Sequence, residues 1–249
     1  GLTIDEQYGG SGGSTRQLAI TIEEIARGCA ATSVIYLAHL SLCTQYIQRF
    51  GSEALKRKFI PPLVSVESVG AFALTEPGAG SDSASISTTA TKSDGNYILN
   101  GTKLFTTNGV EANTVVVLAT QDPTLHGNGI LSLIVEKGSK GFTVNPQHGK
   151  MGIRASSTAE LVFEDCPVPV GNLLGGEGKG FHQTMQMLNA SRIGIAAQSV
   201  GIAQAAYEAA VNYAKERHAF GKQIAEHQAI QWMVADMATE IDAARLLVL

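Results

Sequence analysis

A string of small and hydroxylated residues, Thr75-Glu76-Pro77-Gly78-Ala79-Gly80-Ser81-Asp82, lies where a strand is expected to end. Small residues at a strand end let the backbone approach a bulky polar ligand, and the N–H and O–H groups can donate to phosphate. The string is not a GxGxxG fingerprint and no βαβ unit surrounds it, so a Rossmann dinucleotide site is excluded. Taken alone, such a loop is more often a plain turn than a binding site.

A second string, Phe105-Thr106-Thr107-Asn108-Gly109, follows another strand-like run. Its aromatic ring and hydroxyls could flank a flavin ring and donate to its heteroatoms, but the same residues suit a strand end with an ordinary core Phe. The third string is Arg217-His218-Ala219-Phe220-Gly221-Lys222, at the end of a long helical pattern. Basic residues in a last helical turn are usually solvated partners of the helix dipole, although Arg also suits pyrophosphate. The residues alone leave both alternatives open.

The histidines and cysteines point away from a metal site and from a disulfide framework. The three cysteines are odd in number and far apart, and no CxxC pair occurs. We therefore expect a reducing compartment. Four histidines lack metal-ligand spacing and are more often surface or packing residues. These residues are Cys29, Cys43 and Cys166, and His148, His182, His218 and His227.

The composition indicates a folded globular protein with more than one domain. The 249 residues are 44% hydrophobic and 16% charged, with a net charge of −4 and no long basic run. A nucleic-acid partner is therefore not expected. The longest apolar runs are far shorter than a membrane span, and the first residues lack the basic and apolar regions of a signal peptide.

Residues 1–68 are expected to form three helices, as an N-terminal helical domain. Ser14 and Gln17 have the spacing of a capping box before an apolar periodic run that Gly28 ends. A second apolar helix follows. We expect Pro61 and Pro62 to stop the short basic helix after it, because proline removes a donor and clashes with the preceding turn.

Residues 69–172 change to a two-residue period, which predicts an antiparallel β-domain. Asp94-Gly95 and Asn100-Gly101 accept the positive φ of tight turns, so we expect a hairpin at each. The strands are expected at Ala71–Thr75, Ser87–Thr91, Tyr97–Leu99, Lys103–Thr107, Val115–Thr120, Leu131–Glu136 and Ala159–Phe163.

Residues 173–249 predict a helical domain of two long antiparallel helices, over 180–217 and 226–249. The second carries an apolar stripe at three- and four-residue spacing, which needs partner helices to be buried. The stripe consists of Ile230, Met233, Val234, Met237, Ile241, Ala244 and Val248. The sequence ends at Leu249 without a helix-stop signal, so we expect the helical bundle to be incomplete within these residues.

The three strings, in this order and at this spacing, resemble the acyl-CoA dehydrogenase family. Three further segments share the resemblance, which covers the whole chain: 151–158 (MGIRASST), 163–166 (FEDC) and 192–198 (RIGIAAQ). Residues 23–30 (EEIARGCA) are most similar to the short-chain, or butyryl-CoA, type. The resemblance implies an α+β multidomain fold, with an N-terminal helical domain, a middle β-domain and a C-terminal helical bundle, and a chain truncated at both ends.

The resemblance also implies the residues of an FAD site and an acyl-CoA site. The implied FAD-binding residues are Phe72, Leu74, Thr75, Ser81, Phe105, Thr107, Arg217, Phe220 and Gln228. The implied substrate-binding residues are Ser81, Ser156, Asn189, Ser191 and Arg192. Phe105 stands where the family commonly has Trp, and Asn189 where it commonly has Asp, which puts the contact of Asn189 in doubt. Arg217, Phe220 and Gln228 would reach the FAD of a neighbouring subunit.

The implied activity is that of a flavoprotein oxidoreductase of fatty acid β-oxidation and lipid metabolism. It would convert a short acyl-CoA to the trans-2-enoyl-CoA and pass electrons to an electron-transfer flavoprotein. The implied assembly is a homotetramer built as a dimer of dimers, in the bacterial cytoplasm or the mitochondrial matrix. Alternatives are a flavin-dependent acyl-CoA oxidase and a non-catalytic flavin- or acyl-CoA-binding module. The length and branching of the acyl chain stay open.

No catalytic residue is assigned within the sequence. In the family the base is a Glu located beyond the position of Leu249, or, in some branches, the residue directly before the arginine that Arg192 matches. That residue is Ser191, which has no carboxylate. Glu76 lies in the first string, and we interpret it as structural. We therefore expect the catalytic base to lie outside these residues.

Overall fold

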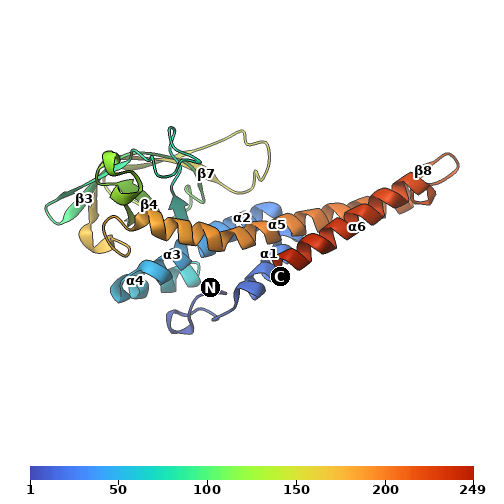
Figure 1. The fold of residues 1–249 in the computed structure, drawn as a ribbon, viewed down its shortest axis with the longest axis horizontal. Helices are drawn as coiled ribbons and strands as arrows, with labels where there is room; N and C mark the ends of the chain where they lie inside the picture. The colour runs from blue at the N-terminus through green and yellow to red at the C-terminus, as the bar shows by residue number, and fades with distance from the viewer. The chain divides into compact units, whose positions relative to one another are not determined.

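A computed structural model describes residues 1–249, which divide into two compact units. The first unit comprises Gly1–Gly13 and Val34–Ser191, and the second comprises Ser14–Ser33 and Arg192–Leu249. Helices precede and follow a central sheet along the chain (Figure 1). The expected order of a helical part, a β-domain and a second helical part is therefore confirmed.

Most of the helical residues of the first unit precede the sheet, and three of the helical segments are continuous with one another. An α-helix, a π-helical stretch and a further α-helix follow each other without a loop. They are α2 (Ala30–Leu37), whose first turn belongs to the second unit, η2 (Ala38–Thr44) and α3 (Gln45–Phe50), with the short η1 (Glu6–Tyr8) before them and α4 (Glu53–Val64) after them. π-Helical turns are rare overall, but those that occur are often found at functional sites. The sequence pattern did not reveal this one.

The expectation that proline ends the basic helix is wrong. Pro61 and Pro62 lie inside α4, which continues to Val64. The missing N–H groups would have bonded to the carbonyl oxygens of Arg57 and Lys58. Both of these residues are exposed, so water can take the place of the lost donors, while the opposite face of α4 is buried and holds the helix in place.

The sheet has seven strands and is largely antiparallel, as expected. Its order is β1-β4-β2-β3-β7-β6, and β5 pairs with β4. The pairings β1–β4 and β2–β4 are parallel. The strands are β1 (Gly70–Ala73), β2 (Thr89–Ser93), β3 (Asn96–Thr107), β4 (Thr114–Thr120), β5 (Ile130–Glu136), β6 (Phe142–Pro146) and β7 (Thr158–Pro169), with the 3-10 segments η3 (Pro123–Gly129), which is kinked at His126, and η4 (Val170–Asn172).

Only the first of the two expected hairpin turns exists. Asp94 and Gly95 have φ values of 47° and 77° between β2 and β3, as a tight two-residue turn requires. Asn100 and Gly101 instead lie inside β3, where its register against β7 shifts, so that prediction is wrong. Gly101 is needed there because a Cβ atom would lie 2.5 Å from Oγ1 of Thr88.

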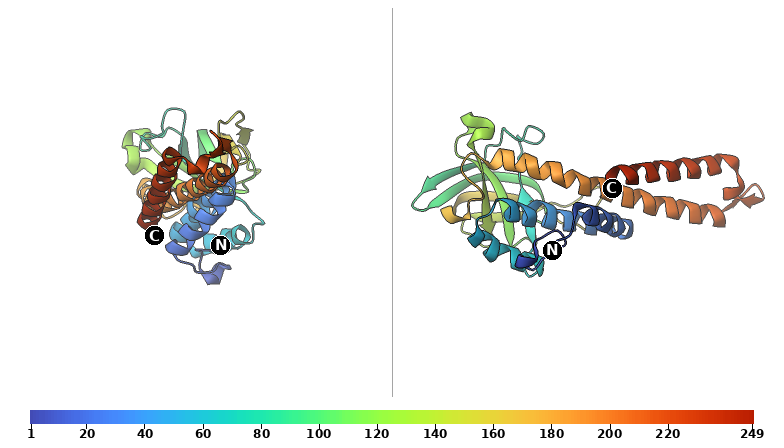
Figure 2. Two further views of the ribbon diagram at one scale, coloured as in Figure 1. Left: turned by 90° about the vertical axis from the view of Figure 1, so that its right-hand side faces the viewer. Right: turned by 60° about the horizontal axis from the view of Figure 1, so that its bottom comes forward.

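The second unit contains α1 and most of the two long C-terminal helices. α1 (Thr15–Gly28) begins with the expected Ser14–Gln17 capping box. α5 (Gly180–Glu216) begins in the first unit, and α6 (Gln228–Val248) runs back beside it, antiparallel as expected (Figure 2). The hairpin β8 (His218–Ala219) and β9 (Lys222–Gln223), followed by η5 (Ile224–Glu226), joins them.

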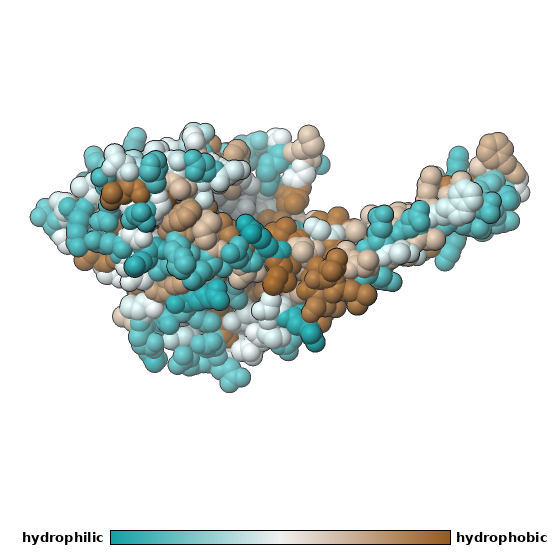
Figure 3. Space-filling model, viewed as in Figure 1, coloured by the Kyte–Doolittle hydropathy of each residue, from teal (hydrophilic) through white to brown (hydrophobic).

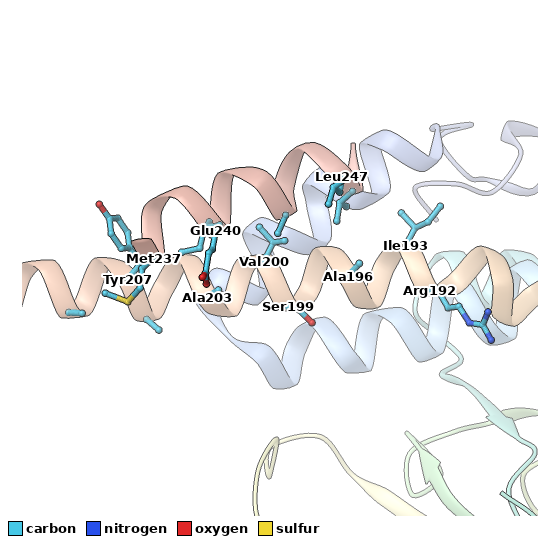
Figure 4. A pocket seen from close by; sticks show the side chains of 15 residues that line it. Arg192, Ile193, Ala196, Ser199, Val200, Ala203, Tyr207, Met237, Glu240 and Leu247 are labelled. Atoms are coloured by element: carbon cyan, nitrogen blue, oxygen red, sulfur yellow. The ribbon is translucent and has the colours of Figure 1, made fainter. Parts of the chain in front are cut away.

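An apolar groove runs between the facing parts of α5 and α6. Val200 and Tyr207 of α5 and Met237 and Leu247 of α6 are among the side chains that line it (Figure 4). Hydrophobic side chains also gather on the surface around the C-terminal end of α6 (Figure 3). No helix in the structure is both long enough and apolar enough to span a membrane.

Candidate functional site

The first two strings of the sequence analysis lie side by side in the structure. The backbone N–H of Leu104 in β3 donates to the carbonyl oxygen of Thr75 over 2.8 Å. Nζ of Lys103 donates to the carbonyl oxygen of Leu74 over 3.0 Å and to Oε1 of Glu76 over 2.6 Å. Residues about 30 positions apart in sequence are therefore joined where β1 ends.

Lys103 and Glu76 form an ion pair that is closed off from solvent. Their side chains are 0% and 1% exposed. Burial lowers the pKa of the Lys103 ammonium, and the Glu76 carboxylate partly offsets that effect. Burial by itself raises the pKa of Glu76, but the charge and hydrogen bond of Lys103 outweigh it and hold that pKa well below its usual range. Both groups are therefore charged near neutral pH.

The carboxylate of Glu76 is also fully engaged by the segment that follows the glycine-rich loop. Its Oε2 accepts from the backbone N–H of Ser87 at 2.6 Å and from the Ser87 hydroxyl at 2.8 Å. Its Oε1 accepts from the backbone N–H of Thr88 at 3.0 Å. A carboxylate with this many donors and a low pKa is a poor proton acceptor, which accords with the structural role inferred from the sequence.

Phe105 is not the ordinary core residue that the sequence left open. The register of β3 against β7 shifts between Lys103 and Thr106, so Phe105 lies in a β-bulge. Its φ is +56° and its side chain is 66% exposed. A positive φ in a bulky residue is a strained conformation that the surrounding structure must hold in place, and such residues cluster at functional sites. The bulge turns an aromatic face towards solvent.

The loop after β1, which Leu104 joins to β3 through Thr75, has open space at its glycines. A Cβ atom added to Gly78 or Gly80 would have no neighbour within 4 Å. Ser81 is exposed in the same loop, and Thr75 is partly buried. Phe72 and Leu74 are partly buried and pack on the small cluster of Ala79, Ile86, Leu118 and Ile130. The site residues expected on β1 and in its loop therefore share one edge of the first unit.

Two buried hydroxyls near the bulge have no hydrogen-bond partner. They are Oγ1 of Thr106, next to Phe105 in β3, and Oγ of Ser156, just before β7. Thr107, which is partly buried, pairs with Thr158 in the ladder between these strands. An orphaned buried hydroxyl calls for an explanation such as a bound ligand, so the ends of β3 and β7 offer donors to a group that packs there.

Lys150 holds the loop that carries Ser156. Its Nζ donates to the carbonyl oxygen of Ile153 over 3.0 Å, to the carbonyl oxygen of Ser156, and to Oγ1 of Thr158 over 3.0 Å. Ile153 has a φ of +51°. The loop between β6 and β7 is thus folded around one ammonium group, which the sequence analysis did not identify.

Asn108, which belongs to the second string, and His39, which the sequence analysis did not identify, also support the site. Asn108 follows β3 with a φ of +64°, and its buried amide donates to the carbonyl oxygens of Ile35 and Gly70 over 3.0 and 3.2 Å. His39 accepts from the N–H of Gly70. The long-range partners of Asn108 and His39 carry no signal in the sequence.

The remaining expected residues lie on α5, α6 and their hairpin. Asn189 and Ser191 lie on α5 in the first unit, and the Ser191 hydroxyl donates to the carbonyl oxygen of Leu188 over 3.1 Å. Arg192 is exposed on the same helix, in the second unit. The structure places Arg217, Phe220 and Gln228 in the second unit also, apart in the chain from the loops of the sheet.

Phe220 occupies the tip of the β8–β9 hairpin in an unusual conformation. It and Gly221 have φ values of +54° and +79°, the pattern of a type I′ turn. The side chain of Phe220 is 97% exposed. Asn or Gly normally takes the first position of this turn, so Phe there has a strained backbone, and its ring makes an edge contact with His227 at a centroid distance of 5.9 Å. Arg217 and Gln228 are exposed at the ends of the adjoining helices.

The chain, with its bulged strand β3 in a sheet between two helical parts, matches one family over nearly all its length. Residues 1–67, 71–166 and 178–249 match the N-terminal, middle and C-terminal domains of acyl-CoA dehydrogenase. The chain therefore belongs to the acyl-CoA dehydrogenase family. No group of three or more His, Cys, Asp or Glu side chains in the structure could hold a metal ion.

Relatives and solved structures agree with this assignment. The chain is 47% identical to a short-chain specific acyl-CoA dehydrogenase of Clostridium acetobutylicum and 50% identical to an acyl-CoA dehydrogenase of Bacillus subtilis, covering 100% of this chain and 65% of each relative. It superposes on butyryl-CoA dehydrogenase from Megasphaera elsdenii with a TM-score of 0.97 at 46% identity, covering 100% of this chain and 66% of that one. It thus spans about two thirds of their length, and the resemblance to the family is confirmed.

Proposed function

We propose that this chain is part of an FAD-dependent dehydrogenase that oxidises a short acyl-CoA to the trans-2-enoyl-CoA. The observation that carries the proposal is the β3 bulge, which exposes the Phe105 ring next in sequence to the unpartnered hydroxyl of Thr106. Family membership and relatives named as short-chain or butyryl-CoA enzymes support the substrate class. One solved neighbour, a glutaryl-CoA dehydrogenase, is described in complex with FADH2.

The residues around the bulge fit a flavin. The exposed ring of Phe105 supplies a flat apolar surface, and the neighbouring Thr107 hydroxyl supplies a donor. Phe72, Leu74, Thr75 and Ser81 would line the same group from β1 and its loop. FAD, when bound, supplies a two-electron acceptor to this site.

Ser81 and Ser156 are the residues of the first unit that we assign to the acyl-CoA side. Ser156 carries a buried hydroxyl without a partner, which suits a ligand that brings its own acceptor. Asn189, Ser191 and Arg192 on α5 are proposed to contact the substrate as well. The hydroxyl of Ser191 already donates to Leu188, so it would act through its remaining acceptor capacity.

The chemistry of the thioester sets what a catalytic base must do, and neither Glu76 nor Ser191 meets that requirement. The α-proton of a thioester is too weakly acidic for an unaided base, so hydrogen bonds must stabilise the charge that develops on the carbonyl oxygen. Glu76 does not serve as the base, because its oxygens are held by Lys103, Ser87 and Thr88. Ser191 has no carboxylate, so neither residue takes the α-proton.

The helical hairpin is proposed to complete the site of a second subunit. The Phe220 side chain is almost fully exposed at the tip of the β8–β9 hairpin, and Arg217 and Gln228 lie on either side of that hairpin in the sequence. We infer that these residues contact the FAD of a partner in a dimer, with two dimers forming a tetramer. The proposed acceptor of the electrons is an electron-transfer flavoprotein, since a neighbour with a TM-score of 0.97 comes from work on the electron transferring flavoprotein of Acidaminococcus fermentans. Relatives from bacteria and from mitochondria support the bacterial cytoplasm or the mitochondrial matrix as the compartment.

Because no base is assigned within residues 1–249, the proposal is tested with the chain extended to the length of its relatives. That protein is purified with its flavin and mixed with butyryl-CoA without oxygen. Loss of the flavin absorbance near its visible maximum, with formation of crotonyl-CoA, is the expected result. Reoxidation is then followed with air and with electron-transfer flavoprotein. Fast reoxidation by air would indicate an oxidase, and bound flavin without bleaching would indicate a binding module. Absence of any flavin would contradict the proposal.

A further inference from the structure

The buried Lys103–Glu76 pair stands out because burying two charges has a large cost. Taking a lysine and a carboxylate out of water is costly, and apolar residues of the same size often give equal or greater stability. Such a pair is therefore weak evidence for stability. Its geometry shows a more specific role, since each partner holds a different part of the site.

Lys103 controls the approach of β3 to the end of β1. Its ammonium donates to the carbonyl oxygen of Leu74 as well as to Glu76. The next residue, Leu104, donates its N–H to the carbonyl oxygen of Thr75. These bonds immediately precede the bulge residue Phe105, whose positive φ must be enforced by its neighbours.

Glu76 controls the other side of the same junction. It lies between Thr75 and the open glycine loop, and it binds Ser87 and Thr88 beyond that loop. Glu76 and Ala79 also exchange backbone hydrogen bonds over 2.9 and 3.2 Å, which closes the loop into a tight turn. The carboxylate thus fixes both ends of the segment that carries Ser81.

We propose that Lys103 and Glu76 are a pair of positioning residues that lock the Phe105 bulge and the glycine loop into one flavin-binding surface. The inference rests on the proposed function, because it assigns the surface to FAD. Neither side chain touches the ligand, since both are enclosed by protein. They act through the backbone of Leu74, Thr75 and Leu104.

The test uses three variants of the full chain, Lys103→Met, Glu76→Gln and the double variant, and follows two quantities. The dissociation constant for FAD should rise about tenfold or more in each, because the bulge and loop are no longer fixed relative to one another. The visible spectrum of the flavin that remains bound should shift, because the ring beside it moves. The double variant carries no buried charge, so its melting temperature should recover above that of Lys103→Met while its FAD affinity stays low.

A matched control is the exposed ion pair of Lys58 and Glu136. It has the same chemistry and a 2.7 Å separation, but its side chains are 55% and 47% exposed. Lys58→Met with Glu136→Gln should leave FAD affinity and the flavin spectrum unchanged. If FAD affinity follows melting temperature across all variants, including full recovery in the double variant, the pair is merely structural and the proposal is overturned.

A measurement without flavin separates this inference from the proposed function. Hydrogen exchange of the Leu104 amide in the flavin-free protein should speed up at least tenfold in Lys103→Met and Glu76→Gln, since its bond to Thr75 is loosened. If the unaltered chain binds no FAD but the Leu104 amide behaves in this way, the proposed function fails and the locking role stands. If exchange at Leu104 is unchanged, the locking role fails whatever the flavin does.

Discussion

The backbone N–H of Gly70 donates to Nδ1 of His39 over 3.0 Å, and Nε2 of the same ring lies 2.9 Å from the carbonyl oxygen of Leu63. An N–H can only donate, so Nδ1 is unprotonated and Nε2 carries the hydrogen. Burial lowers the pKa of His39. The neutral ring therefore joins the π-helical stretch to the first residue of β1, the strand that leads to the glycine loop.

We predict that this link makes the protein less stable in acid. The folded-state pKa of His39 lies below the unfolded value, so the unfolded chain binds the extra proton first. The contribution of His39 is thus present above pH ~6.5 and is lost as pH falls through the folded-state pKa. His39→Gln, which cannot titrate, should flatten this part of the profile. Urea unfolding between pH 5 and pH 8 measures it.

The exposed His148 supplies the control for this prediction. His148→Gln should leave the pH dependence of the free energy of unfolding as it is in the unaltered chain. An unchanged acid profile in His39→Gln would mean that the ring is not held neutral by its two partners.

A second prediction concerns Gly201, where α5 packs on α1. A Cβ atom there would lie 2.2 Å from the carbonyl oxygen of Glu23 and 2.9 Å from Cβ of Ala26. Gly201→Ala should therefore lower the free energy of unfolding by about 2 kcal/mol or more, although alanine is the better helix former. Gly28 at the end of α1 has open space around it, so Gly28→Ala should change stability by less than about 1 kcal/mol. Similar losses in both variants would refute the packing argument.

The third prediction concerns Lys150, around which the β6–β7 loop folds. Lys150→Met removes the donors to Ile153, Ser156 and Thr158. The loop should become more sensitive to limited proteolysis, and KM for butyryl-CoA should rise about tenfold, because Ser156 is no longer held. The amount of bound flavin should change little. Lys140→Met, at an exposed position before the other end of β6, should alter none of these quantities.

Much of the fold follows from short-range pattern. The three- and four-residue spacing of apolar side chains locates α5 and α6, and the Ser14–Gln17 box locates the start of α1. The Asp94-Gly95 turn follows from its conformational preference. Asn100-Gly101 has the same preference, but it lies within β3, which pairs with β7 and packs closely on Thr88 at this point, so it forms an irregularity in the strand instead of a turn.

The site divides in the same way between local and long-range causes. The strings around Ser81 and Phe105 are visible in the sequence, yet the bulge depends on the register between β3 and β7. The Lys103–Glu76 bond joins residues 27 positions apart, and no periodicity signals it. The short edge strand β6 was missed because none of its residues is fully buried and it ends at Pro146.

The last prediction uses the strain at the hairpin tip to separate stability from assembly. Phe220 and Gly221 form a turn with two positive φ angles, for which Asn-Gly is the preferred dipeptide. Phe220→Asn should therefore raise the free energy of unfolding by about 0.5–1 kcal/mol. The same change removes a fully exposed aromatic ring, so it should lower FAD retention and dimer content together, measured by absorbance and by sedimentation. Phe220→Tyr keeps the ring and should retain both.

Arg217→Glu should lower FAD retention and dimer content as Phe220→Asn does, without its gain in stability. Lys215→Glu, also exposed on α5, should leave both quantities unchanged. A Phe220→Asn protein that is more stable and still fully dimeric and flavin-loaded would show that the ring is not used across a subunit interface.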